Sequence, residues 1–142
     1  YKFIRRDYVN NVANLDKYKL FMPKANGTGA FGEVLTLPEI SEPGVGATES
    51  FVSIGLFDTA EECGNLLKYI KSRFMRAMLG VVKITQDLTP SKWKYVPLQD
   101  FTAHSDIDWS KSVAEIDRQL YRKYDLAADE IEFIETHVKE MA

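Results

Sequence analysis

The strongest structural signal in this chain of 142 residues is the sequence TAEECGNLLKYIKSRFMRAMLG, which runs from Thr59 to Gly80. Thr59 precedes Glu62 by three residues, the spacing of a capping box that begins a helix. Apolar residues then recur at helical spacing, at Cys63, Leu66, Leu67, Ile70, Phe74 and Met78. Gly80 stands where a helix commonly ends. The pattern predicts one long helix, with Lys68, Ser72 and Arg76 projecting opposite the apolar stripe.

Strands and shorter helices are predicted on both sides of this helix. Strands are expected at 18–22, where Pro23 ends the run, at 51–56 and at 81–85. The glycine-rich residues 25–50 predict loop with one short strand at 34–37. A capping box at Ser112 and Glu115 and a stripe of Ile131, Ile134 and Val138 predict two further helices. We expect one α+β domain: a small mixed β-sheet packed on one long helix, with a helical C-terminal appendage from 101 to 142 and a lead-in segment at 1–17.

The composition fits an ordinary globular domain. Hydrophobic residues make up 45% of the chain, which is enough to fill a core. Cys63 is the single cysteine; we interpret it as a small core residue, and its isolation favours a reducing cytoplasm. No apolar run reaches the roughly 18 residues of a membrane span. The chain begins at Tyr1 without an initiator Met, so we expect a C-terminal fragment of a longer polypeptide.

Positive charge is concentrated in one part of an acidic chain. Residues 68–94 hold seven Lys or Arg against the single acid Asp87, a local charge of +6 in a chain whose net charge is −3. The rest of the chain therefore carries −9. Local positive fields of this kind commonly meet phosphate, so nucleic acid is the leading partner class. The tail after residue 100 has five Lys or Arg against ten Asp or Glu and should face away from a phosphate backbone.

A glycine-rich loop offers a second feature, with two interpretations left open. Residues 27–34 match G-x-G-x-x-G-x-V, but Pro38 interrupts where a nucleotide-binding fold needs a helix, and no lysine lies between Lys24 and Lys68. Nucleotide binding is therefore disfavoured. Either the glycines serve only to give positive φ, or the amides near Gly27 and Gly29 approach DNA together with Lys24 and Asn26.

No pattern in the chain encodes catalysis. His104, Asp106 and Asp108 could suggest a metal site, yet three such residues in one loop are not a coordination set without further partners, and Asp108 is as well suited to help begin the next helix. His137 is interpreted as a surface residue. We therefore predict no catalytic residue and no metal ligand in this chain.

The basic stretch itself has a purely structural and a functional interpretation. The structural one is a solvated helix face followed by an edge strand protected by lysine. In the functional one, four cations neutralise phosphates, and polar side chains read base edges in the groove. The phosphate contacts would be Lys68, Lys71, Arg73 and Arg76. The base-reading candidates would be Asn26, Thr85 and Gln86.

Several segments, in this order, resemble one protein family. They are Lys24-Ala25-Asn26-Gly27-Thr28-Gly29, Glu49-Ser50-Phe51-Val52-Ser53-Ile54-Gly55, Leu67-Lys68-Tyr69-Ile70-Lys71-Ser72-Arg73-Phe74, Lys83-Ile84-Thr85-Gln86-Asp87, Val96-Pro97-Leu98-Gln99-Asp100-Phe101 and Asp106-Ile107-Asp108-Trp109-Ser110. They are similar to the C-terminal specificity region of adenine-specific DNA methyltransferases of bacterial restriction–modification systems. Some members of that family are type IIG enzymes, which join methyltransferase and endonuclease in one chain. The resemblance runs from about Lys17 to Met141.

This resemblance implies a target-recognition domain for double-stranded DNA. The family's catalytic [N/D/S]-P-P-[Y/F] tetrapeptide has no match here, so the fragment would be no enzyme and would need no cofactor. S-adenosylmethionine, and Mg²⁺ for any nuclease activity, would belong to an upstream methyltransferase or nuclease domain, which would be its partner in the same polypeptide. By position, the Lys24–Gly29 loop and the connector from Lys83 to Gln86 would face the DNA groove.

Two other function classes remain as alternatives. The chain could be a protein-interaction module that docks onto a methyltransferase or nuclease subunit and reads no bases, a role that the acidic tail helices would suit. It could also be an enzyme that binds nucleotide through the glycine-rich loop, which a thermal shift with ATP or NAD would reveal.

Overall fold

The computed structural model describes residues 2–10, 12–82 and 90–141. A short 3₁₀ turn, η1 (Arg6–Tyr8), precedes the first strand, β1 (Tyr18–Pro23), and the strands β2 (Glu39–Ser41) and β3 (Phe51–Phe57) follow. The helices are α1 (Ala60–Lys71), α2 (Arg73–Val82), α3 (Pro90–Trp93), α4 (Val113–Lys123) and α5 (Ala128–His137). The α+β class predicted from the sequence is confirmed.

The three strands form one antiparallel sheet in the order β2-β1-β3. In the central strand, Leu20 lies opposite Ile40 of β2 and Ile54 of β3, and Leu20 and Met22 are fully buried. The strands predicted at 18–22 and 51–56 are therefore present. The strand expected at 34–37 is instead found at Glu39–Ser41, because the backbone N–H of Thr36 donates to the side chain of Asn26 and not to a neighbouring strand.

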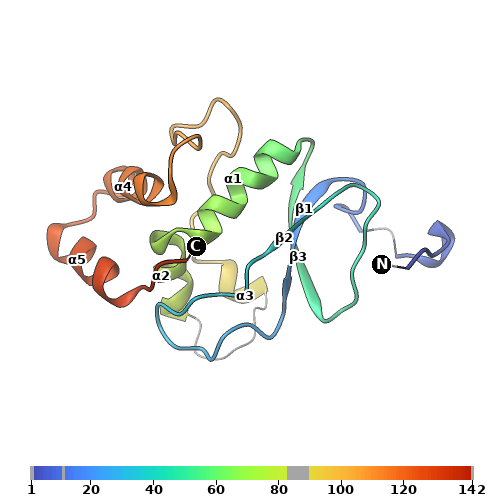
Figure 1. The fold of residues 1–142 in the computed structure, drawn as a ribbon, viewed down its shortest axis with the longest axis horizontal. Helices are drawn as coiled ribbons and strands as arrows, with labels where there is room; N and C mark the ends of the chain where they lie inside the picture. Colours follow the sequence, from blue (N-terminus) through green and yellow to red (C-terminus); the bar gives the residue numbers. More distant parts are fainter. Residues whose placement is uncertain (1, 11, 83–89, 142) are drawn as a thin grey trace.

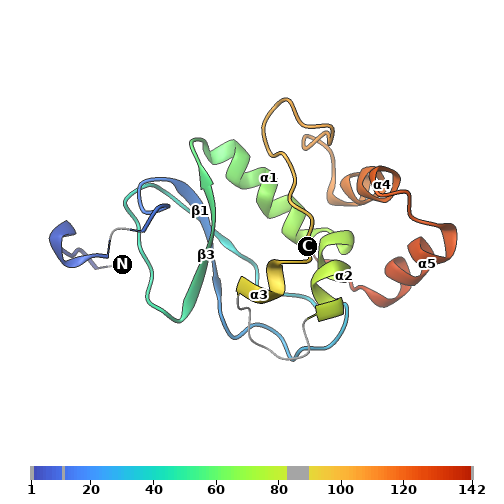
Figure 2. The same ribbon diagram turned by 180° about the vertical axis from the view of Figure 1, so that it is seen from behind.

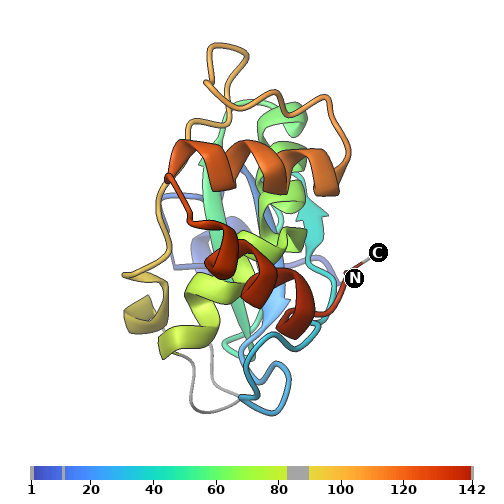
Figure 3. The same ribbon diagram turned by 90° about the vertical axis from the view of Figure 1, so that its left-hand side faces the viewer.

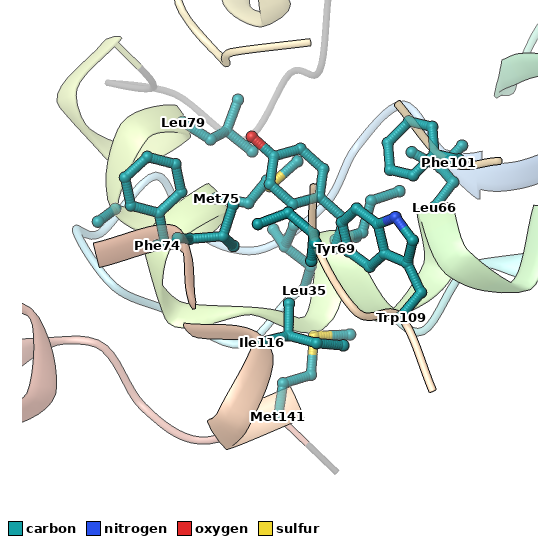
Figure 4. Close-up of a cluster of buried hydrophobic side chains, with 14 of the residues drawn as sticks. Leu35, Leu66, Tyr69, Phe74, Met75, Leu79, Phe101, Trp109, Ile116 and Met141 are labelled. Atoms are coloured by element: carbon teal, nitrogen blue, oxygen red, sulfur yellow. The ribbon is translucent and has the colours of Figure 1, made fainter. Parts of the chain in front are cut away.

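The elements are arranged in three layers. Figures 1 and 2 show the sheet on one side of α1 and the helices α4 and α5 on the other, so that α1 and α2 form the middle layer. Figure 3 shows α4 and α5 lying across the outer face of that layer. One continuous core runs from Leu20 in the sheet to Ile116 and Ile134 in the tail helices, and Figure 4 shows its centre around Tyr69, Met75 and Trp109. The tail is thus an integral part of the core.

The single helix predicted from Thr59 to Gly80 is divided in two at Ser72. Its capped start is confirmed, since the Thr59 side chain accepts a hydrogen bond from the Glu62 N–H and the reciprocal bond is present. Ser72 leaves the helical region with φ −63° and ψ 145°. Its hydroxyl donates to the carbonyl of Tyr69 (2.6 Å) and accepts from the N–H of Met75 (3.2 Å), so this one side chain serves the end of α1 and the start of α2.

Gly80 does not end the helix, because α2 continues to Val82. A Cβ at Gly80 would lie 2.9 Å from the ring of Phe31, so glycine serves here for the close approach of the loop. Val81 and Val82 are therefore helical and not the start of a strand. The remainder of the strand predicted at 81–85 lies outside the described residues.

Candidate nucleic-acid interface

The three helical cations Lys68, Arg73 and Arg76, predicted to meet DNA phosphates, point into the protein. The tail covers the face of α1 and α2 that the helical pattern assigned to solvent. Lys68 Nζ donates to the carbonyls of Trp109 (2.5 Å) and Lys111 (3.5 Å), both in the segment that leads into α4. The ammonium group of Lys68 thus fixes the tail to α1, and the phosphate contact expected for it stays a prediction.

Arg73 is held by the last helix and the residues that follow it. Its Nη1 donates to Oε2 of Glu135 at 2.5 Å, and its Nε donates to the carbonyl of Val138 at 3.1 Å. A carboxylate oxygen of Glu140 lies 3.9 Å from Nη2. Acids of the tail thus already supply negative charge to Arg73, and its contact with a phosphate stays a prediction.

Arg76 is buried, with 3% of its surface exposed. Its Nη1 and Nη2 donate to the carbonyls of Glu33 and Lys71 at 3.3 and 3.2 Å. Burial lowers the pKa of this guanidinium, and the nearby Asp117 opposes that effect. In this structure the side chain of Arg76 is therefore not at the surface, and its phosphate contact stays a prediction.

Asp117 of α4 supplies the anion at the start of α2. The side chain is only 2% exposed; Oδ2 accepts from the N–H of Arg73 at 3.0 Å and Oδ1 from the N–H of Phe74 at 2.9 Å. With Ser72 bonded to Met75, the first three N–H groups of α2 are satisfied. Burial raises the pKa of Asp117 to about 6, despite these two hydrogen bonds.

The glycine-rich loop also encloses a carboxylate of its own chain. Oε2 of Glu33 accepts from the N–H and the hydroxyl of Thr28 at 2.6 and 3.0 Å, and Oε1 accepts from the N–H of Gly29 at 3.0 Å. Gly27 has φ 71° and Gly29 has φ 92°, and a Cβ on Gly27 would meet the Glu33 carboxylate at 2.2 Å. The structure thus favours the interpretation in which the glycines provide positive φ. The amides of Thr28 and Gly29 are occupied by Glu33.

Asn26 belongs to the interior of this loop. Its side chain is 1% exposed, and its Oδ1 accepts from the N–H of Thr36 at 2.7 Å. The amide oxygen of Asn26 thus organises the loop, and its role in reading a base edge stays a prediction.

Gly32 anchors the loop against the end of α5, and this gives a testable prediction. A Cβ on Gly32 would lie 2.2 Å from the carbonyl oxygen of His137, whereas a Cβ on Gly44 would meet nothing within 4 Å, although both residues have positive φ. Gly44→Ala should cost only about 1 kcal/mol of backbone strain. Gly32→Ala should cost about 2 kcal/mol more, because the loop must separate from α5. Urea unfolding of both variants measures the difference; equal losses would contradict the packing described.

One end of the molecule keeps exposed cations. β1 ends at Pro23 next to Lys24, and the loop that follows contacts the last turn of α2, where the Phe31 ring lies against Gly80. α3 packs on α2, and Lys94 follows α3 directly. Figures 1 and 3 show these elements at the lower end of both views. Lys24 and Lys94 are exposed, and Nζ of Lys94 lies 5.7 Å from the ring centroid of the exposed Tyr95.

The other predicted site residues divide into two groups. Lys71 is part-exposed at the end of α1, and Gly27 lies at the surface of the glycine-rich loop. Lys83, Thr85 and Gln86 lie outside the described residues. Their assignments remain predictions.

The sequence analysis missed two acids, Glu33 and Asp117. Their carboxylates accept hydrogen bonds from backbone N–H groups of the glycine-rich loop and of the start of α2. Asp117 had a signal that could have been used: it lies in the apolar stripe of α4, between Val113 and Tyr121 at steps of four residues. A carboxylate in an apolar stripe is expected to be buried, and its burial is costly unless other groups bind it. Glu33 gave a weaker signal, as the first acid after the glycines.

The His104–Asp108 loop is organised by hydrogen bonds and an ion pair. Oδ1 of Asp106 accepts from Lys123 Nζ at 2.8 Å, and Oδ1 of Asp108 accepts from the N–H and hydroxyl of Ser110, at 3.0 and 2.6 Å, just before α4. Among residues 2–10, 12–82 and 90–141, no three His, Cys, Asp or Glu side chains gather as a metal site. Within the same ranges, no helix has the length and apolar character needed to cross a membrane.

No family model, no curated protein and no solved structure matches this chain. The resemblance to methyltransferase specificity regions accordingly remains a prediction from the sequence.

Proposed function

We propose that this chain binds double-stranded DNA as the target-recognition domain of a restriction–modification methyltransferase, and that it does so through the end of the molecule that carries Lys24 and Lys94. In this proposal the chain transfers no methyl group and holds no cofactor, and an upstream domain of the same polypeptide acts on the DNA. The sequence resemblance names the function. The contact between the glycine-rich loop and α2 supports this choice of surface.

That contact is the observation on which the proposal depends. The loop after Lys24 and the chain that leaves α2 are far apart in sequence, yet Phe31 and Gly32 lie against Gly80 near the end of α2. The residue after Val82 is Lys83, and Pro90 resumes the described chain on the same end. In this contact the glycine-rich loop, whose first residues the resemblance assigns to the DNA groove, lies against the last turn of α2.

The charge distribution favours the end with Lys24 and Lys94 over the helical face that carries Lys68 and Arg76. Lys68 and Arg73 are bonded to the tail, and the buried Arg76 donates to carbonyls of the glycine-rich loop and of α1. Three of the seven cations of residues 68–94 thus have partners within the protein. Lys24 and Lys94 are exposed, and Tyr95 adds an exposed aromatic ring beside Lys94. Exposed cations with aromatic side chains suit a surface that meets a phosphate backbone.

The first test is the salt dependence of binding to a mixed-sequence duplex. Fluorescence anisotropy should give affinities that fall steeply from 50 to 200 mM salt, with about three to six phosphates neutralised and a log–log slope of about −0.9 per phosphate. Lys24→Gln and Lys94→Gln together should reduce the size of the slope by about 2, because each lysine replaces roughly one counterion. Lys2→Gln is the matched control, since Lys2 is exposed in the N-terminal segment before η1.

Two outcomes would overturn this proposal. Binding that is flat across this salt range would exclude phosphate contacts. A Lys2→Gln variant that loses as much as the Lys24 and Lys94 variant would place the contact elsewhere. Selection of bound sites from a random duplex pool then separates base reading from simple phosphate binding, because only a recognition domain enriches one sequence.

A further inference from the structure

A groove of about 610 Å³ lies between α4 and α5, above the first turn of α2. It is on the outer face of the tail, which Figure 3 turns toward the viewer, and so lies apart from the end that carries Lys24. Neither the fold nor the proposed DNA contact uses it. Its size is within the range of sites that hold a small ligand or a few side chains.

The floor of the groove is polar, and its polar groups already bind one another. Arg73 and Glu135 form an ion pair there at 2.5 Å, and the hydroxyl of Tyr121 donates to the other oxygen of Glu135 at 2.8 Å. The charge of Glu135 is thus balanced inside the protein. It does not compete with a ligand for the cations at the rim.

The rim presents two guanidinium groups. Arg118 and Arg122 are one helical turn apart on α4, both are exposed, and both line the groove. Within the described ranges, neither guanidinium forms a hydrogen bond or an ion pair closer than 4 Å. The adjacent Glu115 carboxylate is committed to the capping box of Ser112. Arginine forks of this kind bind carboxylates bidentately.

The wall opposite the arginines is aliphatic. Leu126, in the turn between the helices, and Ile131 of α5 are half-buried and face the groove, and Ala114 completes its edge. A ligand that fits must therefore place an aliphatic group beside its negative charge. Removing such a group from water favours binding by about 25 cal/mol per Å².

We propose that this groove is a docking site for a short acidic peptide segment of a partner protein, in which one or two Asp or Glu residues lie beside a Leu or Ile. The carboxylates contact Arg118 and Arg122, and the aliphatic side chain packs on Leu126 and Ile131. Duplex DNA fits the groove less well. Asp125 lines the groove, and Asp129, Glu130 and Glu132 are neighbours in sequence of Ile131, which also lines it. Their combined field repels a polyanion far more than a peptide with two charges.

The test uses the full chain, labelled with ¹⁵N, and two pools of acetylated hexapeptides. One pool combines Asp and Glu with Leu and Ile, and the other replaces every acid by Asn or Gln. The acidic pool should shift the amide resonances of Ala114, Tyr121 and Ile131, and the amide pool should bind at least about tenfold more weakly. The double variant Arg118→Gln with Arg122→Gln should lose the same factor. Arg5→Gln, an exposed arginine in the N-terminal segment, should bind like the unchanged protein.

Three results would overturn the docking site. Equal shifts from both pools would show that the arginines recognise no carboxylate. Shifts outside the groove would place the peptide elsewhere. A twelve-base-pair duplex that shifts the groove resonances more strongly than the acidic pool would identify nucleic acid as the ligand. Because the Lys24 and Lys94 variant leaves the groove intact, failure of the DNA proposal and failure of this one are distinguishable.

Discussion

Asp117→Ala should lower the free energy of unfolding by about 3 kcal/mol at neutral pH. The change removes both acceptors of the Arg73 and Phe74 N–H groups. It also takes from the buried Arg76 a carboxylate that favours its charged form. Unsatisfied buried donors and an unpaired buried charge are each costly. Asp129→Ala is the control, because Asp129 is exposed in the first turn of α5 and should contribute only a few tenths of a kcal/mol. Denaturant unfolding measures both variants, and equal losses of unfolding free energy would contradict the role given to Asp117.

The same carboxyl group should make stability depend on pH. Burial raises its folded pKa to about 6 from an ordinary value of 3.8, so the folded state binds this proton more tightly than the unfolded state. Its stabilising contribution is fully present below about pH 3.8 and is lost as the pH rises through about 6, at a rate of up to about 1.4 kcal/mol per pH unit. Asp117→Asn, which cannot titrate, should remove this component. The free energy of unfolding of the unchanged protein and of Asp117→Asn should be compared between pH 4 and 7. If the two change with pH in parallel, Asp117 does not titrate in this window.

Lys19→Met should lower the free energy of unfolding by about 3 kcal/mol, which is the second large effect that we expect. Lys19 is 1% exposed in the central strand, and its Nζ donates to the carbonyls of Leu15, Lys17 and Glu42 at 3.1, 3.0 and 3.0 Å. Methionine fills a similar volume but donates to none of these three carbonyls, and hydrogen bonds from a charged group are among the stronger ones.

Lys17→Met provides the matched control for this substitution. Lys17 pairs with Asp58 at the protein surface, and exposed pairs contribute at most about 1 kcal/mol. The effect of Lys19→Met should also be visible locally. The N–H of Gly44 donates to the carbonyl of Leu15 at 2.8 Å, so its hydrogen exchange should accelerate in the Lys19 variant and not in the Lys17 variant. Unchanged exchange at Gly44 would show that the ammonium does not join these segments.

The features predicted correctly from the sequence are those fixed by neighbouring residues. The capping boxes at Thr59 and Ser112 act over three residues, and both helices begin where they were predicted. The alternating strand at 51–56 is likewise a local pattern, and β3 spans it. Such signals need no knowledge of the rest of the chain.

The features that were missed depend on residues far away in sequence. The division of the long helix at Ser72 is completed by Asp117, which lies 44 residues from Arg73. The face carrying Lys68 and Arg76 was assigned to solvent because its residues are polar. Carbonyl oxygens of the tail accept from Lys68, and Arg76 is buried against carbonyl oxygens of the glycine-rich loop and of α1. A helical pattern distinguishes apolar from polar positions. It does not reveal that a second layer will satisfy the polar ones.

The tail that neutralises α2 also limits how the protein can be shortened for experiments. Residues 1–100 alone carry a net charge of +2, because the five Lys or Arg and ten Asp or Glu beyond them account for −5 of the total of −3. A truncation before α4 would uncover Arg73 and Arg76, together with apolar core side chains such as Phe74. Such a fragment would adsorb heparin, RNA and DNA indiscriminately, an artefact that could be mistaken for recognition.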